Sequence, residues 1–467
     1  MASVTHFDVV VIGSGSGNSL IDSSFSHLRT AIVERGVFGG TCLNVGCIPT
    51  KMFVHPADLA ASVGESGRLG IDLRLEGVRW RDIRDRVFGR IDAISANGRE
   101  YRAAGLPGTT LFEGTARFVG DRELRIALND GGEETITADQ VVLAAGSRAV
   151  VPPVPGVEDV PVHTSDTIMR IDDVPARLAI LGGGVVAAEF AHVFGSFGSQ
   201  VTIINRSEQL LGSLDEDLSA TFTEHARRTW DVRSPARVTH AAVTADGGVR
   251  LELSGPGDPG TVEADLLLVA TGRRPNSDLL DLAAGGVEVD AAGVVVTDRH
   301  QRTSAPGVWA LGDVANSFQL KHLANHEARV VQHNLLHPED LWERDHEHVP
   351  AGIFTRPQIA TVGLTEAQAR AQGVPHVIAR QQYGDTAYGW ATEDTVGFAK
   401  LLLDPDSGHL LGAHLLGLDA TTVIQPLITA LTFKIPAREF ARGQFWIHPA
   451  LSEVAENALL KHNSPVG

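Results

Sequence analysis

Short apolar runs that end in glycine recur three times along the chain. They occupy residues 9–12, 178–181 and 307–311. An uninterrupted apolar run of this length, closed by glycine, is typical of a strand that is buried on both faces of a parallel sheet. We therefore predict three such strands, each followed by a sharp turn.

The first two runs lead through a glycine-rich turn and a helical pattern into a second apolar run. These second runs are residues 31–34 and 201–204. The order strand, loop, helix, parallel strand is the unit of a doubly wound sheet. The expected fold class is α/β, with two doubly wound Rossmann-like nucleotide-binding domains.

Breaks in the pattern mark the domain boundaries. Proline-rich or charged segments occur at 151–156, 270–276 and 339–350. Beyond the last break, a strand at 400–403 and helices near 365–372 and 420–433 predict a separate C-terminal α+β unit. The predicted domains are residues 1–149, 150–275, 276–345 and 346–467.

Composition narrows the classes of function. Hydrophobic residues make up 43% of the chain, and the formal net charge is −18 without any basic run. Such a surface disfavours nucleic acid and anionic membranes as partners, because both are negatively charged. No apolar stretch approaches the roughly 20 residues that span a bilayer, and the N-terminus lacks a secretory pattern. A cytoplasmic location is expected.

The first glycine-rich turn, residues 13–18, predicts a nucleotide site. Gly13 and Gly15 allow the backbone to approach a diphosphate closely, and Glu34 ends the next strand, where an acid binds ribose hydroxyls. Asn18 stands at the third glycine position of the fingerprint, which leaves the phosphate contacts to Gly13 and Gly15.

The second glycine-rich turn has the form G-x-G-x-x-A, with Gly182 and Gly184 as its glycines. Its second strand ends in Asn205 and Arg206 rather than in an acid. Without the acid, a 2′-phosphate is not repelled, and Arg206 can pair with it. We therefore predict NADPH rather than NADH. The alternative is that Arg206 is only a solvated charge at the end of the strand.

The two cysteines of the chain, Cys42 and Cys47, lie five positions apart. Pro49 suits the first turn of a helix, so Cys47 is expected at a helix N-terminus with Lys51 one turn later. A helix N-terminus and a nearby cation both lower the pKa of a thiol, which favours a redox pair. The alternatives are half of a zinc site, for which no second cysteine pair exists, or two inert core cysteines.

With these motifs in order, the whole chain resembles the pyridine nucleotide-disulfide oxidoreductases of the glutathione reductase and lipoamide dehydrogenase type. The resemblance includes the stretch from Ile447 to Glu453. Within the family it is strongest to the members that act on mycothione, the disulfide of mycothiol. That likeness is carried by residues 13–19, 38–53, 87–92 and 319–334.

The resemblance implies FAD at the first loop and NADPH at the second. The implied FAD contacts are Gly13, Gly15, Glu34, Gly40, Thr41, Lys51, Gly146 and Asp313. The implied NADPH contacts are Gly182, Gly184, Glu189, Arg206, Gly272 and Arg273. Val185 and Gly212 depart from the family, standing where glutathione reductases carry a tyrosine and a second arginine.

The resemblance also implies the catalytic roles. Cys42 attacks the substrate, Cys47 faces the flavin, and Lys51 lies near the flavin, paired with Glu189. His448 acts as general acid and base and Glu453 orients it, both completing the site of the other subunit of a homodimer. The implied substrate is a small-molecule disulfide, mycothione.

Other functions remain as alternatives. They are an NAD-dependent lipoamide dehydrogenase, a glutathione reductase-like enzyme, a transhydrogenase or NAD(P)H oxidase, and a flavin-holding scaffold. His322 and His326 have the spacing of metal ligands, but no third ligand is apparent in the sequence, and no metal is expected.

Overall fold

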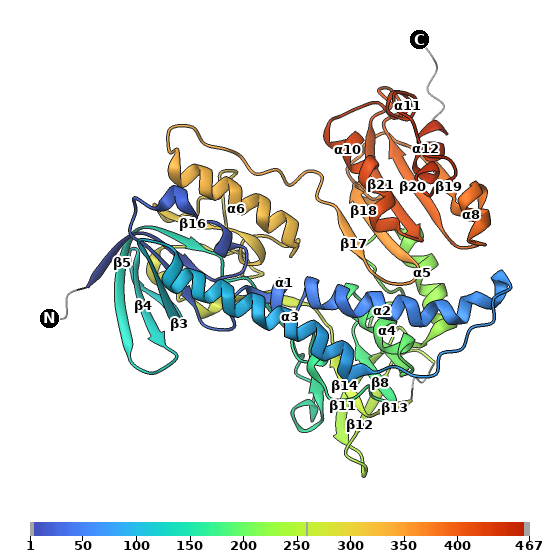
Figure 1. The fold of residues 1–467 in the computed structure, drawn as a ribbon, viewed down its shortest axis with the longest axis horizontal. Helices are drawn as coiled ribbons and strands as arrows, with labels where there is room; N and C mark the ends of the chain where they lie inside the picture. The colour runs from blue at the N-terminus through green and yellow to red at the C-terminus, as the bar shows by residue number, and fades with distance from the viewer. Residues whose placement is uncertain (1–3, 258–259, 462–467) are drawn as a thin grey trace.

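The computed structural model describes residues 4–257 and 260–461. Figure 1 shows three units: a sheet built mainly from the N-terminal third, a second sheet from the middle of the chain, and a C-terminal sheet with its helices. The α/β fold class is confirmed.

The first sheet is parallel at its centre and antiparallel at one side. β2, β1, β5 and β16 run parallel, whereas β4 pairs antiparallel with the long strands β3 and β5. The strands are β1 (Thr5–Ile12), β2 (Thr30–Glu34), β3 (Thr109–Gly120), β4 (Glu123–Leu128), β5 (Glu133–Leu143) and β16 (Val308–Ala310). β16 comes from far along the chain, so the segment after the second sheet completes the first.

One predicted helix is absent. The first glycine loop does not lead into an α-helix but into two 3₁₀ turns, η1 (Gly17–Ser19) and η2 (Ser23–Phe25). The segment is rich in Asn, Ser and Asp, whose side chains compete for backbone hydrogen bonds. Asp22 accepts from the backbone N–H of Ser24, and Ser19 Oγ donates to the carbonyl of Ser16. The prediction of a helix was therefore wrong here.

Two long helices connect the units. α2 (Cys47–Ser66) and α3 (Trp80–Glu100) pack side by side, and α2 also packs on α4 (Val185–Ser196) of the second unit (Figure 1). Phe53 stacks on Trp80, which contacts Phe194 of α4. This buried aromatic cluster fixes the start of α2 relative to α4. The remaining helices of the first unit are α1 (Gly40–Asn44) and α6 (Lys321–Leu336).

The second sheet is entirely parallel, in the order β10-β9-β8-β14-β7. Its strands are β7 (Val162–His163), β8 (Arg177–Leu181), β9 (Gln200–Ile204), β10 (Asp231–Arg233) and β14 (Leu266–Val269). α4 and α5 (Glu216–Thr229) belong to this unit, which also carries an antiparallel meander of β11 (Arg237–Val243), β12 (Val249–Ser254) and β13 (Thr261–Ala264). A two-stranded ribbon of β6 (Ser147–Ala149) and β15 (Arg273–Pro275) joins it to the first unit.

The C-terminal sheet is antiparallel, in the order β17-β18-β21-β20-β19. Its strands are β17 (Ala351–Ile353), β18 (Gln358–Gly363), β19 (Val377–Gln382), β20 (Phe398–Leu403) and β21 (Leu410–Gly417). Its helices are α7 (Glu366–Ala371), α8 (Ala387–Ala391), α9 (Ala420–Val423), α10 (Gln425–Thr432), α11 (Ala437–Arg442) and α12 (Ser452–Leu460). The expected helices near 365–372 and 420–433 and the expected strand at 400–403 are all present.

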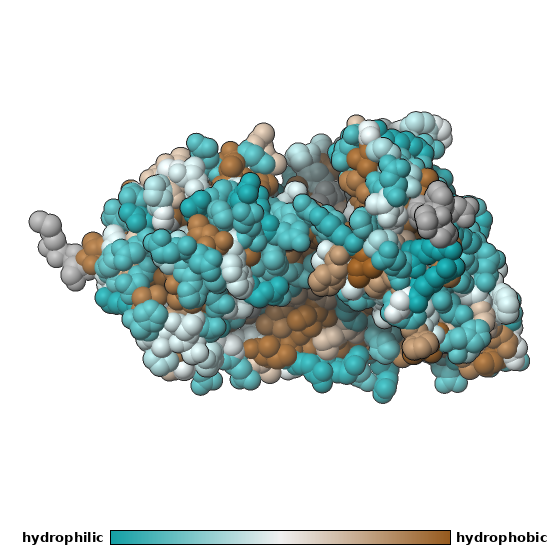
Figure 2. Space-filling view, turned by 90° about the horizontal axis from the view of Figure 1, so that it is seen from above, coloured by the Kyte–Doolittle hydropathy of each residue, from teal (hydrophilic) through white to brown (hydrophobic). Residues whose placement is uncertain are grey.

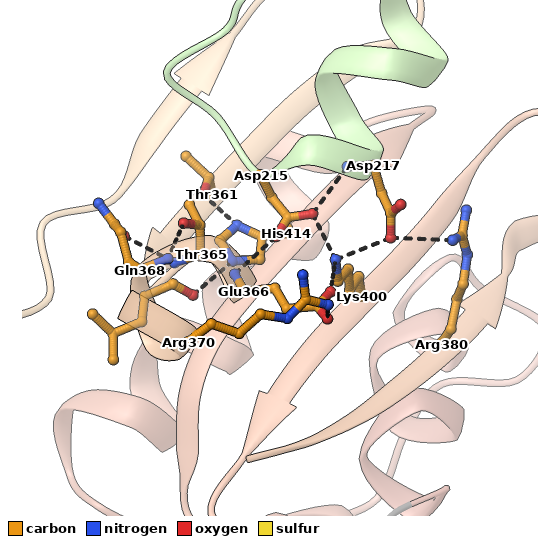
Figure 3. A network of polar contacts seen from close by, with 11 residues as sticks. Asp215, Asp217, Thr361, Thr365, Glu366, Gln368, Arg370, Arg380, Lys400 and His414 are labelled. Carbon is orange, nitrogen blue, oxygen red and sulfur yellow. Dashed lines mark hydrogen bonds and ion pairs between the residues drawn. The ribbon is translucent and has the colours of Figure 1, made fainter. Parts of the chain in front are cut away.

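A buried polar cluster joins the second unit to the C-terminal unit (Figure 3). Lys400 of β20 is 2% exposed, and its Nζ lies 2.8 Å from Asp215, 3.0 Å from Asp217 and 2.6 Å from Glu366. Asp215 caps α5, whereas Glu366 begins α7. A buried ammonium of this kind is tolerated only when it is paired, so the cluster holds the two units in one orientation.

The face in Figure 2 is largely hydrophilic, with apolar side chains gathered in a few patches. No helix within the described part of the chain is long and apolar enough to cross a membrane.

Candidate active site

The two cysteines lie at the junction of α1 and α2. α1 contains Cys42, and α2 begins at Cys47, which confirms the expected helix N-terminus. Asn44 anchors the turn by donating to the carbonyls of Phe38 and Gly40, each at 3.0 Å. Cys42 is half-buried and Cys47 is exposed, and both thiols are free.

The two thiols differ in acidity. Contact between their side chains raises the pKa of Cys42, with burial adding to the effect. The same contact lowers the pKa of Cys47 to about 7, assisted by Lys51 and opposed by burial and Glu189. Cys47 is therefore the thiolate near neutrality, and Cys42 is the thiol that donates to it.

Lys51 links the cysteine helix to the second unit. Its Nζ donates to both carboxylate oxygens of Glu189, at 2.7 and 2.6 Å. Glu189 is buried in α4 and also accepts from the backbone N–H of Phe354 at 3.0 Å. The Lys51 ammonium lies 4.5 Å from the centre of the Phe354 ring, a cation–π arrangement. One positive charge is thereby fixed one turn from Cys47.

The first glycine loop fits a dinucleotide. At Gly13, with φ +107°, a Cβ would lie 2.3 Å from the Ala144 carbonyl oxygen, and a Cβ on Gly40 would lie 2.6 Å from the Cα of Gly15. The loop is therefore pressed against its neighbours and leaves bare backbone for a diphosphate. Thr41 follows as an exposed residue of α1, and Gly146, with φ +67°, turns the chain after β5.

Two acids, Glu34 and Asp313, accept hydrogen bonds from serines at this end of the sheet. Glu34 ends β2, and its Oε2 accepts from Ser14 N–H at 2.8 Å and from Ser14 Oγ at 2.6 Å. Asp313 follows β16, and its Oδ2 accepts from Ser147 Oγ at 2.6 Å. Backbone approach, a strand-end acid for ribose and a second acid together are a suitable set for FAD.

The second loop keeps the helix that the first lacks. At Gly182, with φ +127°, a Cβ would lie 2.3 Å from the Ala270 carbonyl oxygen, and Gly184 directly precedes α4. Gly272, at φ +117°, is exposed. N–H groups at the start of α4 can therefore receive a second diphosphate.

The two residues after β9 differ: Asn205 is buried and hydrogen-bonded, whereas Arg206 is exposed. Asn205 is buried, and its Nδ2 donates to the carbonyls of Ser207 and Gln209 at 2.7 and 2.9 Å. Arg206 is exposed and forms no ion pair within the described residues. The Arg273 guanidinium is engaged instead, with Nε 2.9 Å from Ser147 Oγ and Nη1 3.7 Å from Asp166. The guanidinium thus contacts Ser147, the residue that donates to Asp313.

His448 and Glu453 form a pair of their own. His448 Nδ1 lies 2.7 Å from Glu453 Oε1, and Glu453 Oε2 accepts from Ala450 N–H at 3.2 Å. The His448 side chain is 70% exposed. No hydrogen bond joins it to either cysteine within the described chain. The carboxylate fixes the ring orientation and leaves Nε2 free to exchange a proton.

Sequence reasoning assigned no role to three polar contacts at the first loop. These are Ser14 with Glu34, Ser147 with Asp313, and Lys321 with Ser16 at 3.0 Å. The serines carry no sequence signal, because serine is common in loops. Lys321 did carry one, since the chain has only five lysines.

The two histidines with metal-ligand spacing point to different partners. His322 Nε2 lies 2.8 Å from the Pro350 carbonyl oxygen, and His326 Nε2 accepts from Asp345 N–H. No group of three or more His, Cys, Asp or Glu side chains suited to a metal occurs among residues 4–257 and 260–461.

Comparison with known proteins agrees with this geometry. The family described as pyridine nucleotide-disulphide oxidoreductase matches residues 7–328, and its dimerisation domain matches residues 349–459. The chain is 50% identical over 460 residues to the mycothione reductase of Mycobacterium tuberculosis, covering 97% of this chain and 99% of the other. It is 32% identical to a dihydrolipoyl dehydrogenase of Chlamydia muridarum, covering 98% of each.

A solved structure shows the same fold. The Cu(II) complex of the HOCl-induced flavoprotein disulfide reductase RclA from Escherichia coli superposes with a TM-score of 0.86 at 27% identity, covering 98% of this chain and 99% of that one. The chain therefore belongs to the pyridine nucleotide-disulphide oxidoreductase family and is an FAD-dependent disulfide oxidoreductase.

Proposed function

We propose that this enzyme uses NADPH to reduce mycothione, the disulfide of mycothiol, to two mycothiol molecules. The observation that carries the chemistry is the placement of the cysteine pair: Cys42 lies in α1 in contact with Cys47, which begins α2 with the Lys51 ammonium one turn later. The substrate is supported by the mycothione reductase at 50% identity. NADPH is supported by Arg206, which is exposed beside the second loop and free of carboxylates among the described residues.

The cofactors supply the electrons. When bound, FAD would supply hydride-accepting chemistry between NADPH and the Cys42–Cys47 pair. Gly13, Gly15, Gly40, Thr41 and Gly146 would offer backbone to FAD. Glu34 would hold the ribose hydroxyls, Asp313 the ribityl chain, and Lys51 would lie near the flavin. Gly182, Gly184, Glu189, Gly272 and Arg273 would line the NADPH side, and Arg206 would pair with the 2′-phosphate.

The protein's own residues carry the disulfide exchange. Cys42 loses its proton to His448 and attacks one sulfur of the substrate disulfide, which forms a mixed disulfide. His448 then gives that proton to the departing thiolate. The Cys47 thiolate then attacks Cys42 Sγ, which restores the Cys42–Cys47 bond and expels the second product as a thiolate that takes a proton from solvent. One NADPH and one proton thus convert one disulfide into two thiols.

His448 acts in the site of a partner subunit. Within one chain it belongs to the C-terminal unit, which matches the family's dimerisation domain. Phe433, Phe445 and Ile447 of the same unit are largely exposed. Exposed apolar side chains of this size support an interface between two copies of the chain. Glu453 holds the ring of His448 in the orientation that the exchange requires.

The test is oxidation of NADPH and of NADH by the holoenzyme against mycothione, glutathione disulfide and lipoamide. We expect turnover with NADPH and mycothione to exceed every other combination. Preferential turnover of lipoamide with NADH would show a lipoamide dehydrogenase. Oxidation of NADPH without any disulfide would show an oxidase, and no turnover at all would favour a scaffold.

A further inference from the structure

The two glycine loops lead into different local structures. α4 has 12 residues and starts directly after the second loop. After the first loop the chain forms only η1 and η2, of three residues each. A helix N-terminus carries roughly half a positive charge. The first loop therefore lacks an electrostatic contribution that the second loop possesses.

Arg102 fixes the shape of this helix-free segment. It lies in the π-helix Tyr101–Gly105, and its Nε donates to Asn18 Oδ1 and its Nη2 to the Asn18 carbonyl, both at 2.7 Å. A further nitrogen donates to the carbonyl of Ile21. The side chain that replaces the third fingerprint glycine thus has a structural partner. The guanidinium is held by Asn18 and Ile21 and stabilises this segment of the chain.

Lys321 brings a positive charge to the same loop. It is the first residue of α6, which packs against η1, and its Nζ donates to Ser16 Oγ at 3.0 Å. Lys51 and Lys400 are paired with carboxylates, whereas Lys321 forms no ion pair within the described residues. An ammonium offers three donors, so this half-buried side chain has donors left for an anion.

The N-terminus of α6 is an electrostatically unfavourable place for the Lys321 ammonium. Lys321 stands at the positive end of α6, where a cationic side chain raises the free energy of the helix. Contact with Cys47 and burial raise the pKa of Cys42, and Lys321 is near enough to oppose both. The ammonium therefore lies between the glycine loop and the redox pair. An anion beside Ser16 would offset the cost of placing it there.

We propose that Lys321 binds the diphosphate of FAD and replaces electrostatically the α-helix that is absent after the first glycine loop. The inference rests on the assignment of that loop to FAD. It explains why an ammonium without a carboxylate partner stands beside Ser16. It also explains how a loop without a following helix retains a strongly bound diphosphate.

The experiment compares the holoenzyme with Lys321→Gln, Lys321→Arg and, as a matched control, Lys434→Gln at an exposed lysine. The dissociation constant of FAD is measured from flavin fluorescence released on dilution, at several NaCl concentrations. We expect Lys321→Gln to weaken FAD binding about 10- to 100-fold, as for the loss of a charge-assisted hydrogen bond. Lys321→Arg should keep most of the affinity, and Lys434→Gln all of it. Added salt should raise the dissociation constant of FAD by a larger factor in the unmodified enzyme than in Lys321→Gln, because salt screens the Lys321 charge.

Unchanged FAD affinity in Lys321→Gln would overturn the inference. Equal losses in the Gln and Arg variants would also overturn it, because they would indicate a steric role, and so would an identical salt dependence. None of these readouts depends on the substrate. An enzyme that binds FAD as expected but reduces no disulfide would contradict the proposed function alone.

Discussion

Lys51 and Glu189 are 138 positions apart in the chain, yet the Lys51 ammonium contacts both carboxylate oxygens of Glu189. The pair joins the cysteine helix α2 to α4, the helix that follows the second glycine loop. Lys51 lowers the pKa of Cys47 and Glu189 raises it. The acidity of the thiolate therefore depends on the packing of one nucleotide domain against the other.

Removing Lys51 and removing Glu189 should shift the pKa of Cys47 in opposite directions. We expect Lys51→Met to raise it from about 7 towards the ordinary thiol value. Alkylation of the reduced enzyme at neutral pH should then slow roughly tenfold, because less thiolate is present. Glu189→Gln should lower the pKa and shift the thiolate absorbance titration to more acidic pH. Shifts of the same sign in both variants would contradict this balance of charges.

His448 should matter for only one half of the cycle. We expect His448→Ala to lower disulfide turnover about 10²- to 10⁴-fold, because a general acid and base is lost. Reduction of the bound flavin by NADPH, followed by stopped-flow absorbance, should stay at the original rate. Glu453→Gln should have a smaller effect, since the ring remains but is less firmly oriented. Equal slowing of both half-reactions would place His448 elsewhere in the mechanism.

Arg206 should decide between NADPH and NADH. We expect Arg206→Gln to raise the KM for NADPH about 10- to 100-fold, the effect of losing a charge-assisted contact with the 2′-phosphate. The KM for NADH should change little. Arg237→Gln, another exposed arginine of the same unit, is the control. Steady-state kinetics with both nucleotides gives the answer, and a parallel rise in both KM values would argue against a phosphate contact.

The Lys400 cluster should be important for stability rather than for chemistry. Lys400→Met removes the ammonium and leaves the buried Asp215 without its cation, whereas Asp217 and Glu366 keep Arg380 and Arg370 (Figure 3). Loss of one partner from a buried ion pair costs about 3–5 kcal/mol. Urea unfolding followed by circular dichroism should show an earlier transition, whereas Lys434→Met should not. A midpoint that stays in place would mean that the cluster does not hold the two units together.

The first unit shows where local pattern misled. A helix was predicted between the first glycine turn and β2, yet hydrogen bonds of Asp22 and Ser19 accompany 3₁₀ turns there. Arg102, more than 80 positions away, then fixes Asn18 in place. A long-range partner of this kind is invisible in the local pattern. The same holds for Arg273, whose guanidinium donates to Ser147, 126 positions away.

Local sequence was enough to predict the strands beside both glycine turns and the start of α2 at Cys47. These depend on short-range rules: apolar runs, the conformational freedom of glycine, and proline in a first helical turn. The family followed from the resemblance of the ordered motifs to known members. Only the tertiary structure decided which distant polar groups meet, such as Lys51 with Glu189 and Lys321 with Ser16. Electrostatic contacts depend on distance in space, and that distance is set by how the helices pack rather than by spacing along the chain.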